Sequence, residues 1–188
     1  MRHFRYISLF IIHFLFCTIC FAQREKIDSL EKVLPSLRDS SRVDCLNELS
    51  EAYILANRID SAKYHVALAY EESKKINYGH GMAEAKSLEA ETVGEDFFQA
   101  EKLNREAIEL YTTTQNKKRL AETYFNLGFV LYAQSMFTEA IKNFDTNYKL
   151  YKKNNNARGM CRAISTAAWV YEESGNYEKA FELASEKS

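Results

Sequence analysis

The side chains best suited to metal binding or catalysis are few and scattered in this sequence. His65 falls within a helix-like stretch and His80 stands between two glycines, and neither has a second histidine or a cysteine at metal-ligand spacing. The glycines around His80 lack a third glycine and a preceding strand, so they do not predict a phosphate-binding loop. Adjacent acids such as Glu71 and Glu72 point in different directions on a helix, as solvated carboxylates do. We therefore expect no catalytic site, metal or cofactor here, and any catalytic domain would lie beyond residue 188.

Charge and cysteine content restrict the classes of partner. The chain has 25 Lys and Arg against 26 Asp and Glu, a balance that does not favour nucleic acid or an anionic membrane surface as the partner. Two cysteines outside the amino-terminal segment, Cys45 and Cys161, fall on different repeats of the pattern described below. A disulfide needs Cα atoms within about 7 Å, so we expect both thiols to be free.

The amino terminus has the pattern of a secretory signal. Arg2 and Arg5 precede an apolar run over residues 6–21, and the small residue Ala22 offers a cleavage point. The run is shorter than the roughly 20 residues that a membrane-spanning helix needs. We therefore expect residues 1–22 to be a signal peptide and the protein to be exported, to the periplasm or the extracytoplasmic side of the inner membrane. The alternative is that this segment is retained as a membrane anchor.

Four alanines recur along the rest of the chain at nearly constant spacing. They are Ala62, Ala100, Ala140 and Ala180, and each follows a bulky apolar residue by three positions. Self-similarity at a period of about 20–50 residues indicates a stacked repeat array. Leu, Ala, Glu, Lys and Tyr recur at spacings of three and four, and strand signals are missing. The sequence therefore predicts an all-α solenoid of about four helix pairs.

Short turns within pairs and longer cationic junctions between pairs set the expected boundaries. The expected helix pairs are 42–56 with 59–76, 81–93 with 97–114, 118–134 with 137–153, and 158–174 with 177 to the end. The repeats then cover about 42–80, 81–117, 118–157 and 158–188, the last one incomplete. We expect the junction cations, such as those at 117–119, to act as charged caps that interact with the helix dipole.

A short opening helix and a linker are expected over residues 23–41. The residues expected on its apolar face are Ile27, Leu30, Val33 and Leu34. Residues 41–44 have the S-x-x-D form of a capping box, which predicts that the first long helix begins at about residue 42.

The repeats resemble tetratricopeptide repeats (TPR). The third unit carries the family pattern most fully, at Tyr124, Leu127, Gly128, Leu131, Phe137, Ala140 and Phe144. The period exceeds the family's usual spacing of about 34 residues and is similar to that of the longer-helix TPR variants in bacterial signalling proteins. The resemblance implies a right-handed α–α superhelix without catalytic activity. It also implies a concave groove, lined by the first helix of each pair, that takes a protein or peptide ligand.

Groove-facing positions of the family carry large aromatic residues in the third and fourth units. Carried over residue by residue, these positions hold Glu122, Phe125, Phe129 and Tyr132 in the third unit and Trp169 in the fourth. The implied arrangement places Phe129 and Trp169 side by side as anchors for a ligand. The alternative is that both rings are covered by the protein's own helices or by downstream sequence.

The first two units differ, because the matching positions are polar. These positions hold Asp44, Asn47, Glu51 and Glu89. The resemblance therefore implies a groove that grades from acidic to aromatic along the array.

Two further residues, Asn126 and Arg162, stand where some TPR modules hold the carboxyl terminus of a peptide. The preceding unit offers Ala85 and Glu89 where that clamp has Lys and Asn. The other interpretation is that Asn126 and Arg162 belong to an ordinary polar helix face.

A signal peptide, an opening helix and a long-period TPR array in this order resemble the extracytoplasmic front of bacterial sensor histidine kinases and of membrane-anchored regulators. The last helix reaches Ser188 with an apolar stripe still uncovered, so we expect the N-terminal part of a longer signal-transduction protein. Its expected role is a non-catalytic protein-interaction or sensing module, attached to a membrane only through residues 1–22 or through downstream sequence. The alternative is a free-standing periplasmic adaptor or assembly factor.

Overall fold

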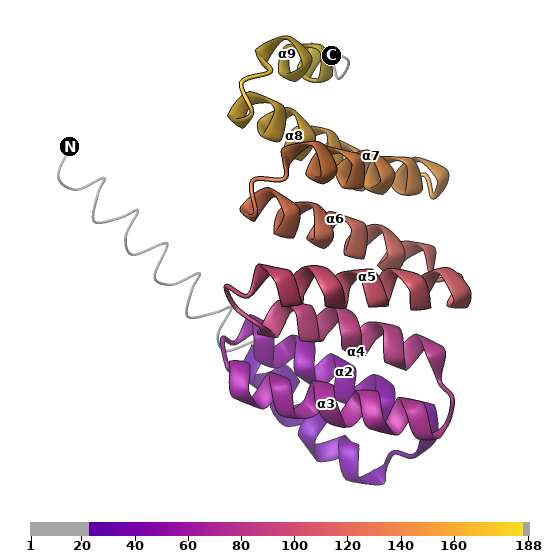
Figure 1. Ribbon diagram of the computed structural model, residues 1–188. Helices are drawn as coiled ribbons and strands as arrows, with labels where there is room; N and C mark the ends of the chain where they lie inside the picture. The colour runs from indigo at the N-terminus through magenta and orange to yellow at the C-terminus, as the bar shows by residue number, and fades with distance from the viewer. Residues whose placement is uncertain (1–22, 186–188) are drawn as a thin grey trace, which may run out of the picture.

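The structure, a computed structural model, describes residues 23–185, and the predicted signal peptide lies outside the described residues. Within 23–185 the chain consists of helices joined by short turns, without a strand. Figure 1 shows these helices stacked in chain order, from α2 and α3 at one end of the column to α9 at the other. Each helix packs on the helix before it and the helix after it, and α2 also contacts α4. The predicted all-α solenoid is confirmed.

The helices alternate between a first and a second member of each pair. A helical segment over 23–33 leads into the 3-10 turn Leu34–Ser36. The pairs are α2 (Asp39–Leu55) with α3 (Ile59–Lys75), α4 (Gly79–Thr92) with α5 (Phe97–Thr114), α6 (Lys117–Ala133) with α7 (Phe137–Lys153), and α8 (Ala157–Glu173) with α9 (Tyr177–Ser185).

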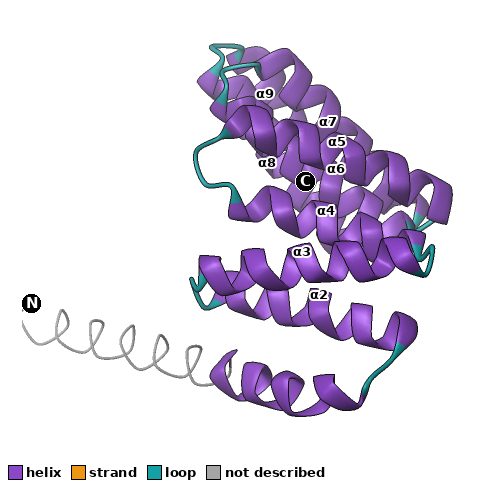
Figure 2. Cartoon of the chain, turned by 60° about the horizontal axis from the view of Figure 1, so that its bottom comes forward, coloured by secondary structure: helices purple, strands orange, loops and turns teal. Residues whose placement is uncertain are grey.

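The opening helix covers the first edge of the stack, beside α2 (Figure 2). Ile27 is buried in a cluster with Leu49 and Tyr53 of α2, and Leu30 packs on the same cluster. Val33, however, is 43% exposed, so its predicted place on the packed face is wrong. It stands six residues after Ile27, about 240° round a helix that turns about 100° per residue, and therefore points away from α2.

The first long helix begins at Asp39, earlier than predicted, and the expected capping box at residues 41–44 is not formed. Asp39 has a φ of 50°, so the chain turns sharply before Ser41, which lies inside the first turn of the helix. The residue before the helix, Arg38, donates from Nη1 to the carbonyl oxygens of Pro35 and Leu37 at 2.8 and 2.6 Å. These bonds hold the linker in a tight bend that the capping pattern did not anticipate.

Residues with positive φ terminate the helices at every later turn. They are Asn57, Asn77, Gly94, Gln115, Ser135, Asn155 and Gly175. Glycine adopts this left-handed conformation freely, as at Gly94 with φ 66°, and asparagine is one of the few other residues that adopt it readily. The short turns keep successive helices antiparallel and in contact.

Small residues mark the closest contacts between helices. Ala62, Ala100 and Ala140 are buried, as the repeat pattern predicts, whereas Ala180 on α9 is only partly buried. A Cβ added to Gly128 of α6 would lie 2.6 Å from the ring of Phe144 on α7. The absence of a side chain at Gly128 therefore lets the Phe144 ring fill the space between α6 and α7.

Candidate ligand-binding groove

The first helices of the four pairs, α2, α4, α6 and α8, share a face that contains two adjoining cavities. The first cavity, about 300 Å³, is lined by α2, α4 and the start of α6. The second, about 250 Å³, extends over α4, α6 and α8. Glu51, Glu84 and Arg119 line both, so the two cavities form one groove, which we call the inner groove.

Carboxylates dominate the charged lining of the inner groove. The groove carboxylates are Asp44, Glu48, Glu51, Glu84, Glu91 and Glu122. The cations that line it are Lys118, Arg119 and Arg162. Asp44 and Glu51, which the sequence predicts at an acidic end of the groove, both line the first cavity.

A single guanidinium, that of Arg119, connects three of these carboxylates. Its Nη2 lies 2.6 Å from Glu84 Oε1, and its Nη1 lies 3.2 Å from Glu122 Oε2 and 3.8 Å from Glu51 Oε1. Burial opposes the charge of Arg119, but Glu84, Glu122 and Glu51 outweigh this effect and raise its pKa. Arg119 therefore ties α2, α4 and α6 together across the floor of the groove.

Glu84 is the most enclosed of the groove carboxylates. Only 8% of the residue is exposed, and its Oε2 accepts a 2.6 Å hydrogen bond from the Tyr111 hydroxyl of α5. Burial raises the pKa of Glu84 above its usual 4.5, although the bond from Tyr111 and the charge of Arg119 act in the opposite direction. Burial and the neighbouring Glu84 carboxylate raise the pKa of Tyr111 as well, so this hydroxyl remains protonated.

Replacing Glu84 with glutamine is expected to flatten the dependence of stability on pH. A raised pKa means that the folded state binds this proton more tightly than the unfolded state does. The unfolding free energy of the unmodified protein therefore falls as the pH rises from about 4.5 through the raised pKa of Glu84. Glu84→Gln has no such proton, so it should lose this part of the slope in urea unfolding at a series of pH values. Glu109→Gln, at an exposed position on α5, is the control, and equal slopes in the two variants would contradict the assignment.

Phe125 and Phe129, the aromatic residues of α6 that are predicted to face the groove, differ in how much of each side chain is exposed. Phe129 is 38% exposed, whereas Phe125 is partly buried and packs against the core cluster that contains Phe144. The two rings meet edge to face, with centroids 4.9 Å apart. Asn126 lines the second cavity and stands three residues before Phe129, so helical spacing places the exposed ring on the face that bears the groove.

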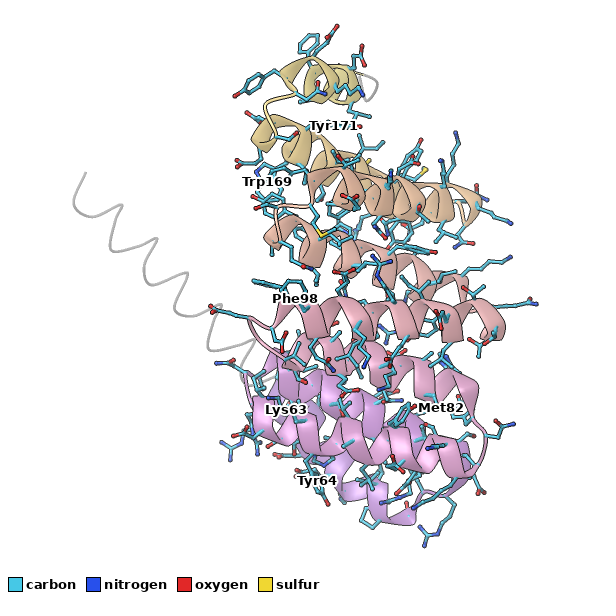
Figure 3. All side chains as sticks on the ribbon, viewed as in Figure 1. Lys63, Tyr64, Met82, Phe98, Trp169 and Tyr171 are labelled. Atoms are coloured by element: carbon cyan, nitrogen blue, oxygen red, sulfur yellow. The ribbon has the colours of Figure 1, made fainter. Side chains whose placement is uncertain are left out.

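Trp169 on α8 is 39% exposed, but its ring neighbour is Tyr132 and not Phe129. The centroids of Trp169 and Tyr132 are 4.5 Å apart, and Tyr132 also packs against the core cluster. Figure 3 labels Trp169 towards the carboxyl end of α8 and Phe98 at the start of α5, on the same side of the stack. The expected pairing of Phe129 with Trp169 is therefore replaced by a Tyr132–Trp169 pair that bridges α6 and α8.

Asn126 and Arg162 both line the second cavity, and both already have partners within the protein. Asn126 Nδ2 donates to Glu91 Oε1 at 3.2 Å. The Arg162 guanidinium lies 4.1 Å from the centroid of the Phe125 ring and donates to the Tyr151 hydroxyl at 3.0 Å. Because Glu91 and Glu122 line the same cavity, the local charge does not favour the capture of a peptide carboxylate.

Comparison with known proteins supports this interpretation of the architecture. Residues 119–186 match the family model described as Tetratricopeptide repeat. A putative kinesin light chain from Podosopora anserina, solved with nearly identical TPR-like repeats, is similar over 87% of this chain and 84% of its own, with a TM-score of 0.66 and 16% identity. The fold is a TPR-like solenoid.

Two other solved structures share the fold over a shorter part of their own length. Aspartyl phosphate phosphatase F from Bacillus subtilis is 18% identical with a TM-score of 0.77, over 88% of this chain and 48% of that chain. A Rap protein complexed with Competence and Sporulation Factor is 19% identical with a TM-score of 0.73, over 87% of this chain and 48% of that one. The chain thus spans about half the length of these two proteins. A search of curated proteins found no match.

In the second repeat unit, the register inferred from the family pattern is wrong at Glu89. This residue pairs with Lys86 at 3.1 Å and lines a separate cavity with Val66 and Tyr70 of α3. The inner groove instead receives Glu84, Ser87 and Glu91 from α4. The spacing in sequence between the start of α4 and the start of α6 is two residues shorter than the spacing between the starts of α6 and α8. The expectation that Glu89 faces the groove assumed that these two spacings are equal. A two-residue difference moves a helical position to another face.

Five charged groove residues were not predicted from the sequence to face the groove: Glu48, Glu84, Glu91, Lys118 and Arg119. Arg119 was expected to cap a helix dipole at a junction, but it lies in the first turn of α6 and reaches across to Glu84. Aligning the starts of α4 and α6 would have found Glu84, because it occupies the same place in α4 as the groove-facing Glu122 does in α6.

Within residues 23–185, no helix is long and apolar enough to cross a bilayer. No group of three or more His, Cys, Asp or Glu side chains within this range could hold a metal ion.

Proposed function

We propose that this protein is a non-catalytic interaction module that holds a peptide segment of a partner protein in the inner groove. The observation that carries the proposal is the presence of two adjoining polar cavities on the first helices of the pairs, two of which, α6 and α8, also carry the partly exposed rings of Phe129 and Trp169. Polar groups that fix orientation beside exposed aromatic anchors are typical of peptide-binding surfaces. The solved Rap protein complexed with Competence and Sporulation Factor supports the proposal, because a protein of similar fold binds a partner.

Trp169 allows a direct test, because it is the chain's only tryptophan and is partly exposed. Peptides selected from a random display library against the purified protein should change the emission of Trp169 saturably, with one peptide per chain. Selected peptides should also compete with one another for binding. Failure to select any peptide, or selected peptides that bind without competing or changing the emission, would contradict the proposal.

The cellular setting is a second part of the proposal and rests on the sequence. Arg2 and Arg5 before an apolar run support export, with residues 1–22 removed as a signal peptide. The mass of the protein recovered from the periplasm tests this, because a product that retains Met1 in the membrane fraction would replace the signal peptide with an anchor.

We infer further that ligand binding is passed to a signalling part of a longer protein, as in the sensor histidine kinases and membrane-anchored regulators that the array resembles. The alternative is a free-standing periplasmic adaptor. The reading frame beyond Ser188 distinguishes the two. A stretch of about 20 apolar residues followed by a kinase-like or DNA-binding segment supports the signalling role. A stop soon after one further helix supports the adaptor.

A further inference from the structure

The inner groove concentrates negative charge in a chain that is almost neutral. The whole chain has a formal net charge of −1, whereas six carboxylates line the groove against three cations. Counted in the same way, the residues that line the groove have a formal net charge of −3. A cleft lined mainly by one sign of charge attracts a ligand of the opposite charge.

Two of the three cations are already engaged with groups of the protein. Arg119 is shared among Glu51, Glu84 and Glu122, and Arg162 lies over the ring of Phe125. Glu51 also pairs with Lys26 at 3.9 Å, whereas within residues 23–185 Glu48 has no ion pair and Glu91 accepts only the neutral amide of Asn126. Burial and the charges of Glu51 and Glu84 raise the pKa of Glu91, although Arg119 acts in the opposite direction, so a ligand that brings its own positive charge would offset this repulsion.

An unpaired acceptor in the first cavity points to the same ligand chemistry. Asn47 lines this cavity and is only 4% exposed. Its Nδ2 donates to the carbonyl oxygen of Gly81 at 3.2 Å, but its Oδ1 accepts no hydrogen bond from the described part of the chain. A buried acceptor without a donor is destabilising, so an N–H group that arrives with a ligand would be stabilised there.

We propose that the inner groove binds a basic peptide segment, whose Lys or Arg side chains pair with the carboxylates of α2 and α4 and donate towards Asn47. This assignment rests on the proposed function and specifies the chemistry of its partner. The groove continues across four helices, which suits an extended segment, and the rings of Phe129 and Trp169 belong to α6 and α8, the two helices that follow the acidic part. A basic segment that also carries a bulky apolar residue would pair with the carboxylates and pack against these rings.

The test uses peptides selected from a random display library against the full protein. The selected sequences should be enriched in Lys and Arg relative to the unselected library. Replacing those residues with glutamine in the tightest peptide should abolish measurable binding in fluorescence anisotropy. Raising the salt concentration should weaken binding, because exposed charge pairs are screened.

On the protein side, the double variant Glu48→Gln with Glu51→Gln should bind the tightest peptide about tenfold more weakly, equivalent to about 1.4 kcal/mol. The matched control is Glu95→Gln with Glu109→Gln, which removes two exposed carboxylates outside the groove and should leave the affinity unchanged. Circular dichroism of both variants verifies that they remain folded.

The outcomes separate the two proposals. If peptides bind competitively but are not enriched in Lys and Arg, or bind the Glu48→Gln, Glu51→Gln variant as tightly as the unmodified protein, the proposal of a basic partner is overturned and the proposed function stands. If no peptide is selected, both are overturned. If the groove is instead filled by a second copy of this chain, the protein sediments as a dimer that the Glu48 and Glu51 changes dissociate, which also overturns the basic peptide.

Discussion

Replacing Phe144 with alanine is expected to lower the unfolding free energy by about 3–5 kcal/mol, the usual cost of deleting a core aromatic side chain. Phe144 is fully buried in the cluster that contains Leu127, Leu131 and Val170. Its ring occupies the space left by Gly128 and contacts the rings of two groove-side phenylalanines. The cavity left by alanine would open between α6 and α7 and weaken the support of the third TPR unit.

Urea unfolding followed by circular dichroism measures this effect. Phe98→Ala is the matched control, because Phe98 is the same residue type on α5 and is 80% exposed. Its cost should remain within about 0.5 kcal/mol, as for surface substitutions generally. Similar costs for Phe98→Ala and Phe144→Ala would show that the packing between α6 and α7 is not as described.

The fold could be predicted because its determinants are local and repeated. Ala62, Ala100 and Ala140 are all buried, so the same small buried residue recurs once in each of the first three pairs. Left-handed residues such as Asn57 and Gly94 end helices close to the predicted points. Each unit contacts mainly its neighbours, so a pattern analysed one repeat at a time describes the whole stack.

The groove could be predicted only in part, because the face that a residue occupies depends on helix phase. Asp44 and Glu51 were placed correctly, since they occupy the same places in α2 as Glu122 and Phe129 do in α6. The step from α4 to α6 is two residues shorter than the other steps between first helices, and this difference alone moved the expected acid from Glu91 to Glu89. The spacing of the repeated alanines does not reveal this two-residue difference. It becomes visible only when the first helices of the pairs are aligned with one another.

Side-chain reach was the other property that the sequence did not reveal. Arg119 belongs to a run of cations that a helix-dipole argument explains equally well. Its connection to Glu84 depends on the distance between two helices that are separated in the chain by α5. The same holds for Trp169, whose ring partner is Tyr132, a residue that lies about one helical turn beyond the expected partner Phe129.

The central claim is that the partly exposed rings beside the inner groove anchor a ligand. Phe129→Ala and Trp169→Ala should each weaken the binding of a selected peptide by about 2 kcal/mol or more, a factor of about 30, as hot-spot aromatic residues do. Both rings retain more than a third of their exposure, so neither substitution should cost as much stability as Phe144→Ala. Tyr64→Ala is the control, because Tyr64 is 66% exposed on α3, a second helix of its pair.

The most direct measurement is therefore peptide affinity and unfolding free energy in the same set of variants. Phe129→Ala and Trp169→Ala should lose affinity while keeping most of their stability, Phe144→Ala should lose stability, and Tyr64→Ala should keep both. If Phe129→Ala and Trp169→Ala unfold as readily as Phe144→Ala, or bind the peptide as tightly as Tyr64→Ala does, the two rings are not ligand anchors and the account of the groove is contradicted.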